Sequence, residues 1–310
     1  MTITIGLALG GGGARGAAHI GVLQVLHENG IQISHVAGTS AGAIIGAMYA
    51  YNPDPVWIEN RFTEFLKSDV FLNMGTNRIR EKDRPDSAIG QLTKLVRDRI
   101  VLIMSQQKSY LIKREKLVRA IEFLIPVTDF TELTIPLSVT ATDIQNGTQI
   151  VYDHGDLIDA IVQSSSIPGF VQPTELDDMI IVDGGVIDPI PVEIAKNHTD
   201  FTIAVSITKD SLKELRTKNI YEILTRSDQI TSSYLAKSKI QKADFVIKPS
   251  VGGLHWSRFD QFDTLQKSGR DAAEDIINEL KQEINRRSSI FYSLKQKLGL
   301  TRKCSYFLRQ

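Results

Sequence analysis

Short apolar runs alternate with glycine-rich turns over the first fifty residues of the chain. Residues 2–9 are apolar and rich in β-branched side chains, which is typical of a buried strand. Residues 17–27 carry apolar side chains at helical spacing, and Gly30 follows them as the expected C-cap. A second strand is predicted over residues 31–37 and a second helix over residues 43–50. This alternation predicts the start of a parallel sheet covered by helices.

The rest of the chain continues this alternation and predicts an α/β fold, with a central, mostly parallel sheet and helices on both faces. Asn146-Gly147 separates two of the later apolar runs and is typical of a hairpin turn. Further strands are predicted over residues 137–142, 149–152, 179–183, 201–207 and 245–249. Further helices are predicted over residues 56–68, 156–163, 191–197 and 271–284.

Two segments bring basic and apolar side chains close together, and each leaves two interpretations open. Residues 69–122 predict an insertion of amphipathic helices, either a lid or acyl-chain wall that meets anionic head groups or a solvated helical cap. Residues 286–310 contain no acidic side chain, which suits an anionic membrane surface or a loosely packed terminal helix. We expect one α/β domain over residues 1–285, containing the insertion, and a basic amphipathic tail over residues 286–310.

The composition of the chain limits which partners and which cellular compartment we expect for the protein. The chain has 310 residues with 36 basic and 36 acidic side chains, so no net charge favours a nucleic-acid partner. Cys304 is the single cysteine, which excludes a disulfide framework and a cysteine-rich metal site. Residues 1–9 lack the features of a signal peptide, and no apolar run approaches the roughly 20 residues that span a bilayer. We expect a cytoplasmic protein, whose insertion and tail are candidate contacts with the inner face of a membrane.

A serine lies at the predicted turn from the second strand into the second helix. It stands in Gly38-Thr39-Ser40-Ala41-Gly42, which has the G-x-S-x-G spacing of a nucleophile elbow. Glycine at positions 38 and 42 removes side chains that would collide across so tight a turn. The start of the helix directs positive potential towards a developing oxyanion. An N-capping serine at an ordinary turn is the structural alternative, and these five residues alone do not decide between the two.

A glycine-rich loop, residues 10–16, connects the first predicted strand to the first helix. Its spacing fits the G-x-G-x-x-G pattern of a dinucleotide site, but the next predicted strand ends without an acid for the ribose. An oxyanion hole fits better, because the bare amides of Gly11, Gly12 and Gly13 can turn inward beside the elbow. Arg15 adds positive potential to the same loop.

A second reactive group is predicted at the end of the strand over residues 179–183. Asp183 ends this strand and two glycines follow it, and ligands of open α/β sheets bind at the carboxyl ends of strands. A carboxylate there can accept the proton of Ser40 or hold its hydroxyl in orientation. An Asp-Gly turn is the structural alternative. Asp188 is a weaker candidate, and residues 164–166, three serines without a glycine frame, fit a turn with local hydroxyl caps.

Together the three motifs resemble the patatin-like phospholipase family, in particular its small bacterial members. The family pattern is a G-G-G-x-[RK]-G loop, a G-x-S-x-G elbow and a D-G-[GA] strand end, in the order found here. Segments 18–23, 141–143 and 166–168 match the family as well, and the resemblance covers about residues 5–207. It implies a three-layer α/β fold and the hydrolysis of acyl esters of phospholipids, lysophospholipids or neutral lipids, without a metal or cofactor.

The resemblance also implies a Ser–Asp dyad that works without histidine. Ser40 is then the nucleophile that forms an acyl-enzyme, and Asp183 is the base that activates it. The amides of the glycine loop, helped by Arg15, hold the oxyanion. Asp188 departs from the pattern, because many relatives have asparagine there, and a second carboxylate either repels Asp183 and alters its pKa or has no effect.

Three other functions stay open on the sequence. An α/β-hydrolase triad would add His198 or His255 to the same serine and aspartate, although a glycine loop directly ahead of the elbow fits that fold less well. A nucleotide-binding regulatory protein would use residues 11–16, and an adaptor would keep the fold and act through partners. His19 and His27, on the first predicted helix, fit packing or surface positions.

Overall fold

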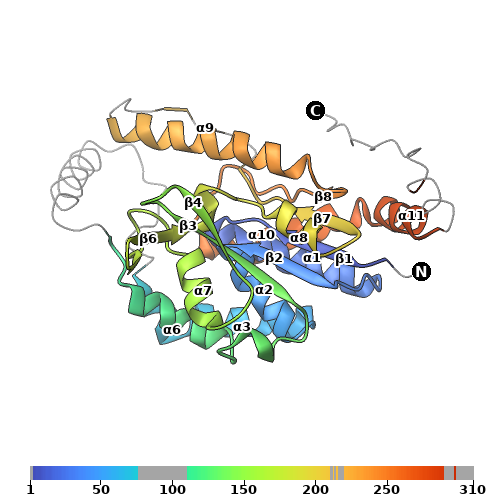
Figure 1. Ribbon diagram of the computed structural model, residues 1–310, viewed down its shortest axis with the longest axis horizontal. Helices are drawn as coiled ribbons and strands as arrows, with labels where there is room; N and C mark the ends of the chain where they lie inside the picture. Colours follow the sequence, from blue (N-terminus) through green and yellow to red (C-terminus); the bar gives the residue numbers. More distant parts are fainter. Residues whose placement is uncertain are drawn as a thin grey trace.

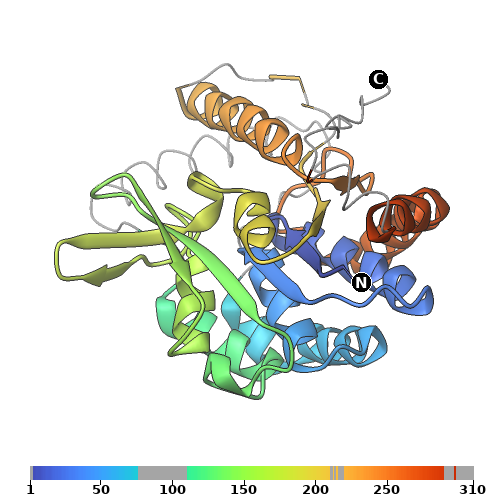
Figure 2. The same ribbon diagram turned by 45° about the vertical axis from the view of Figure 1, so that its right-hand side comes forward.

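The computed structural model describes residues 3–75, 110–209, 212, 214–215, 220–289 and 297. These residues form an eight-stranded sheet between two layers of helices (Figures 1 and 2). The strand order is β5-β6-β3-β2-β1-β7-β8, and β4 pairs with β3 outside this order. The strands are β1 (Ile5–Leu9), β2 (His35–Thr39), β3 (Leu137–Asp143), β4 (Thr148–Tyr152), β5 (Thr174–Leu176), β6 (Met179–Asp183), β7 (Phe201–Val205) and β8 (Phe245–Ile247).

The predicted fold class is confirmed, because the five consecutive strands β3, β2, β1, β7 and β8 are parallel and helices cover both faces. The larger core takes side chains from α1 (Ala17–Glu28), α2 (Ala41–Tyr51), α3 (Pro55–Lys67), α4 (Asp69–Met74), α6 (Arg114–Leu124), α7 (Leu157–Ser164), α10 (Phe262–Glu274) and α11 (Ile277–Ser288). The smaller core takes side chains from α8 (Val192–Asn197) and α9 (Ile220–Ile240). Short 3-10 helices span Gly13–Gly16, Phe130–Glu132, Gly184–Val186 and Phe259–Gln261.

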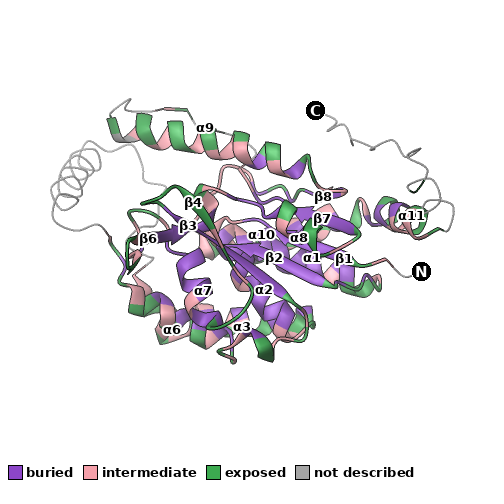
Figure 3. Ribbon diagram, viewed as in Figure 1, coloured by how far each residue is buried: buried purple, intermediate pink, exposed green. Residues whose placement is uncertain are grey.

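The two faces of the sheet carry side chains of different size. Leu7 and Leu9 of β1 belong to the larger core, whereas Ala8 between them belongs to the smaller one. Ala37 of β2 likewise lies in the smaller core, next to Val36 in the larger one. Successive strand residues point to opposite faces of the sheet. Because the alanine side chains on one face are small, α8 and α9 can pack close to the strands there. Both faces are shielded, and Figure 3 shows the central strands as buried.

The strand that ends in Asp183 runs in the direction opposite to that expected. The prediction placed Asp183 at the carboxyl edge of a parallel sheet, but β6 pairs with β3 in antiparallel orientation. Along β3, Thr140 is the partner of Thr39 at the end of β2, and the next residue, Ala141, is the partner of Asp183. β4 pairs with one edge of β3 at both of these residues, so β2 and β6 must both pair with its other edge. The carboxyl ends of β2 and β6 therefore meet there.

Other predictions concern the later helices and the segments outside the central fold. The single helix predicted over residues 271–284 is wrong, because α10 ends at Glu274 and α11 begins at Ile277. Of the predicted insertion, α4 and the start of α6 are described, while residues 76–109 lie outside the described residues. The tail predicted over residues 286–310 also lies outside them, apart from residues 286–289 and 297. None of the helices in the described ranges is both long and apolar enough to cross a membrane.

Candidate active site

Ser40 occupies a strained turn where β2 leads into α2. Its φ angle is 54° and its ψ angle is −121°, a conformation that costs a non-glycine residue of the order of 1–3 kcal/mol. Glycine is required on both sides of it, because a Cβ at Gly42 would lie 2.1 Å from the Leu9 carbonyl oxygen and one at Gly38 2.6 Å from the Gly42 carbonyl oxygen. The turn therefore has the geometry of a nucleophile elbow rather than that of a helix capped by a serine side chain, which makes no capping hydrogen bond here.

Ser164, at the end of α7, holds the elbow from the side. The backbone N–H of Ser40 donates to Ser164 Oγ at 2.9 Å, and Ser164 Oγ donates to the carbonyl oxygen of Thr140 at 2.6 Å. Ser164 is fully buried, so this contact replaces water for the amide of the strained residue. Local hydroxyl capping was predicted for residues 164–166, and Ser166 does donate to the Val162 carbonyl oxygen. The contact with Ser40 spans 124 residues of sequence and has no local signal.

Asp183 lies beside Ser40 because β6 ends where β2 ends. The Ser40 hydroxyl donates a hydrogen bond to its carboxylate, and the N–H of Gly185 donates to Asp183 Oδ1 at 2.7 Å. Its own backbone is fixed by the N–H donated to the Ser166 carbonyl oxygen at 2.9 Å. Burial of the carboxylate raises the pKa of Asp183 to about 6, against the lowering effect of the two hydrogen bonds. The site thus brings together a serine hydroxyl and a carboxylate that titrates close to neutral pH.

The glycine loop lies directly against the elbow. A Cβ at Gly11 would lie 3.3 Å from the Cβ of Ser40, so the two backbones are adjacent. The N–H of Gly11 already donates to the Pro189 carbonyl oxygen at 2.9 Å, so this predicted oxyanion donor is engaged and shapes the loop instead. In the part of the chain that the structure describes, the N–H groups of Gly12 and Gly13 donate to no acceptor.

Arg15 and His19 orient the peptide groups of this loop. Arg15 Nε donates to the Gly12 carbonyl oxygen at 3.1 Å, which directs the N–H of the same peptide group, that of Gly13, the opposite way. His19 Nε2 lies 2.8 Å from the Gly10 carbonyl oxygen, so it donates a hydrogen bond there. Burial lowers the pKa of His19 to about 4, which keeps it neutral at physiological pH. The packing position predicted for His19 is confirmed by its burial, but its hydrogen bond was not foreseen.

An apolar pocket adjoins Ser40 on the face of the sheet that carries α2, α3 and α6. Three phenylalanines form one wall of it: the ring centroid of Phe71 lies 5.4 Å from that of Phe65 and 5.3 Å from that of Phe259. Trp256 joins the pocket to the glycine loop, since its carbonyl oxygen accepts the N–H of Ala14 at 2.7 Å. The remaining lining is almost wholly aliphatic and includes Ile44, Ile45, Ile112, Leu117, Ala120, Ile121, Leu124, Ile167 and Val171.

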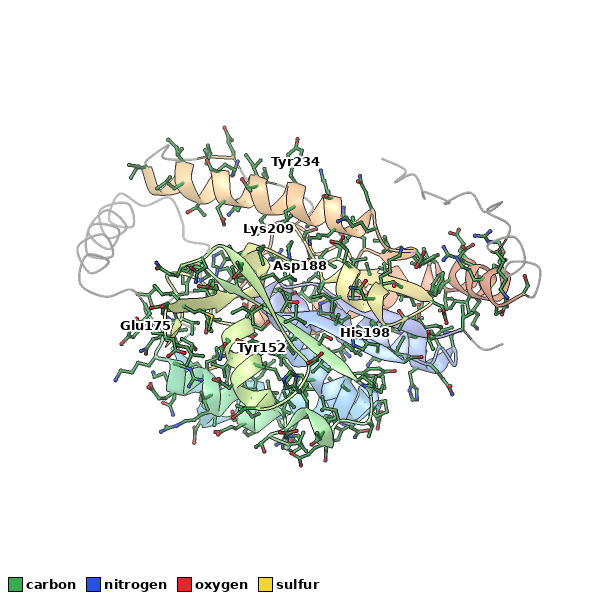
Figure 4. All side chains as sticks on the ribbon, viewed as in Figure 1. Tyr152, Glu175, Asp188, His198, Lys209 and Tyr234 are labelled. Carbon is green, nitrogen blue, oxygen red and sulfur yellow. The ribbon has the colours of Figure 1, made fainter. Side chains whose placement is uncertain are left out.

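The histidines proposed for a triad lie in different places. His198, labelled in Figure 4, stacks on His35 with ring centroids 4.3 Å apart. Because His35 is the first residue of β2 and Ser40 follows the last, His198 lies at the strand end opposite to Ser40. His255 follows β8, and its Nδ1 lies 2.8 Å from Ser257 Oγ. The direct partner of the Ser40 hydroxyl is the Asp183 carboxylate.

Comparisons with known proteins agree with the motifs. A family model described as patatin-like phospholipase matches residues 7–196. An uncharacterized NTE family protein of Mycobacterium bovis is 35% identical over 204 residues, which are 66% of this chain and 49% of that protein. Lysophospholipase NTE1 of Meyerozyma guilliermondii is 28% identical over 204 residues, 66% of this chain and 12% of that protein. The chain spans about half the length of the first curated relatives it matches.

Among solved structures, VipD from Legionella pneumophila is similar to the chain. The alignment has a TM-score of 0.49 at 18% identity and covers 90% of this chain and 67% of VipD.

Proposed function

The chain belongs to the patatin-like phospholipase family, and from this premise we propose that it is a serine acyl-ester hydrolase acting on phospholipids or lysophospholipids. One observation carries the proposal: a strained, buried serine shares a hydrogen bond with a buried carboxylate beside an apolar pocket. The lysophospholipase name of a relative favours a lipid ester, and the apolar lining next to Ser40 suits an acyl chain.

In the proposed reaction, Ser40 Oγ attacks the carbonyl carbon of the ester and passes its proton to the carboxylate of Asp183. The tetrahedral intermediate collapses, the bond to the alcohol breaks, and Asp183 gives its proton to the departing oxygen. The acyl group then remains on Ser40. A water molecule, deprotonated by Asp183, attacks this acyl-enzyme and releases the fatty acid, while the proton returns to Ser40 Oγ.

The environment of Asp183 suits both halves of this cycle. A base is most effective when its pKa lies near the working pH, and burial raises the pKa of Asp183 to about 6. At neutral pH the carboxylate is ionised and can accept a proton, yet its conjugate acid is strong enough to protonate a leaving alkoxide. An exposed aspartate, with a pKa near 3.9, would be a much weaker base.

The oxyanion is assigned to the free amides of Gly12 and Gly13, with the N-terminus of α2 behind Ser40. These N–H groups belong to a loop that Arg15 and His19 hold in one orientation, so little reorganisation accompanies the build-up of charge. The α2 helix begins at Ala41 and adds the positive end of its dipole.

Contact with a membrane surface is part of the same proposal. The described ends of the insertion flank the pocket. Leu72 and Leu111 lie on these ends and are 56% and 52% exposed to solvent. Lys113, Lys116 and Arg119 are exposed on the same segment. Apolar side chains beside basic ones suit the surface of an anionic bilayer from which a lipid ester would enter the pocket.

Release of fatty acid from lysophosphatidylcholine and from phosphatidylcholine vesicles tests the proposal. We expect release by the wild type and none by Ser40→Ala, with Ser138→Ala, a buried serine on the neighbouring strand, as the control for folding. A folded wild type that releases no fatty acid from either lipid would contradict the proposal.

A further inference from the structure

An ion pair between a buried aspartate and a partly buried lysine links α9 to the loop that follows Asp183. Asp188 is 1% exposed, and Lys239 Nζ, from the last turn of α9, lies 3.2 Å from Asp188 Oδ1. Asp188 lies between α9 and the sheet (Figure 4). Gln149 Nε2 of β4 donates to the other carboxylate oxygen at 2.9 Å. Asp188, which departs from the family pattern, therefore has its negative charge balanced by Lys239, a residue remote in sequence.

The backbone of Asp188 connects both halves of the candidate site. Its carbonyl oxygen accepts the hydroxyl hydrogen of Thr39, the residue before Ser40, at 2.8 Å. Its N–H donates to the carbonyl oxygen of Gly184, the residue after Asp183, at 2.8 Å. Any movement of Asp188 is thus transmitted to the residues that flank the serine and the catalytic carboxylate.

Lys239 is placed firmly enough to fix this residue. Ala236 and Ile240, on either side of it, are buried in the smaller core, so this turn of α9 cannot shift without unpacking it. Glu193 of α8 lies 3.4 Å from Lys239 and itself pairs with Lys242 at 2.7 Å. Among the residues that the structure describes, the charged groups that act on Asp188 are Lys239 and, more distant, Glu193 with its own partner.

We propose that Lys239 is a positioning residue of the active site: its ion pair holds Asp188 in place, and thereby holds the turns that carry Ser40 and Asp183. This inference rests on the proposed function for its effect on activity. Removing one member of a buried pair leaves an uncompensated charge, whereas removing both leaves none. Replacing both Lys239 and Asp188 should therefore restore the activity that is lost when Lys239 alone is replaced.

The test compares Lys239→Met, Asp188→Asn, the double variant and Lys239→Arg in the full chain, using a short p-nitrophenyl ester. We expect Lys239→Met to lower kcat by roughly tenfold with little change in KM. The double variant and Lys239→Arg should recover most of this loss. Lys242→Met is the matched control, because Lys242 lies three residues further on and pairs with Glu193 at the surface; it should leave kcat unchanged.

The pH dependence separates this role from simple packing. Burial raises the pKa of Asp188, and Lys239 opposes this rise. In Lys239→Met the carboxyl group should therefore stay neutral to a higher pH and then become an unbalanced buried carboxylate as the pH increases. The ratio of the variant's kcat to that of the wild type should therefore fall with rising pH. A ratio that is constant with pH, or a double variant with only the summed losses of the single ones, would overturn the inference.

A second readout keeps the test independent of the proposed function. Thermal unfolding of the wild type, Lys239→Met, Asp188→Asn and the double variant should show a non-additive double variant, because the two charges stabilise each other. If the wild type hydrolyses no ester, the proposed function fails, while non-additive unfolding still supports the ion pair and additive unfolding overturns it.

Discussion

Replacing Asp183 by asparagine should strongly lower kcat and make the folded protein more stable at neutral pH. The pKa of Asp183 is raised from 3.8 to about 6 in the folded protein, chiefly by burial. Between these two values the native state binds a proton that the unfolded state does not, so the free energy of unfolding falls as the pH rises. The contribution of the protonated group is present below pH 3.8 and is lost above about 6.

The size of this effect follows from the shift. A rise of about two pH units corresponds to on the order of 3 kcal/mol at neutral pH. Asparagine carries no charge at any pH, and its side-chain oxygen can still accept the N–H of Gly185. The variant should therefore regain most of this free energy, while the loss of a proton acceptor should lower kcat by roughly 100- to 10,000-fold.

Urea unfolding of wild type and Asp183→Asn at neutral pH and near pH 4, together with ester hydrolysis, measures both quantities. We expect the stability difference to be large at neutral pH and to shrink in acid. Asp200→Asn is a useful control, because hydrogen bonds from Thr4 lower the pKa of Asp200. This substitution should therefore decrease the stability at neutral pH, whereas Asp183→Asn should increase it. An asparagine variant that is no more stable than the wild type at neutral pH would refute the reasoning.

Four further outcomes are expected. The kcat/KM of the wild type should fall about tenfold per pH unit below pH 6, since Asp183 must be ionised, and a profile flat down to pH 5 in an ester assay would contradict this. Ser164→Ala should lower stability by about 1–3 kcal/mol in thermal unfolding and also lower kcat, because the amide of the nucleophile loses its acceptor. Gly13→Ala should lower kcat by roughly 100-fold, because a Cβ there would lie 2.5 Å from the Trp256 carbonyl oxygen and displace an oxyanion amide; unchanged kcat would exclude that amide. Ala120→Phe should reduce kcat/KM for long-chain esters more than for short ones, and an equal reduction would argue against an acyl chain in the pocket.

The features predicted well from the sequence are those that depend on neighbouring residues. The elbow needs glycine at position 38 because the backbone of Gly42 and Ala43 is so close, and this local requirement is visible in five letters. The glycine at position 42 is part of the same pattern, but the backbone it makes room for is that of Leu9, on the neighbouring strand. The alternation of strands and helices likewise follows from local periodicity. Arg15 was expected near the oxyanion, and the structure shows it bonded to the loop itself, a detail that spacing cannot give.

The remainder depends on register and on contacts remote in sequence. Asp183 was expected beside Ser40, but its approach on an antiparallel strand follows from β3 being longer than β2, so that β6 can pair with the extra residues. Ser164 and Lys239 carry no motif, since their partners lie 124 and 51 residues away. The break between α10 and α11 could not be predicted from the sequence, because neither proline nor glycine lies between the two helices.

The most direct test of the Ser–Asp dyad is fluorophosphonate labelling, combined with hydrolysis of a short p-nitrophenyl ester. The proteins to compare are the wild type, Ser40→Ala, Asp183→Asn and a variant with alanine at both His198 and His255. The dyad requires that Ser40→Ala lose label and turnover, that Asp183→Asn lose turnover, and that the histidine variant keep both. Loss of activity in a folded histidine variant would contradict the dyad and establish a histidine-dependent mechanism in its place.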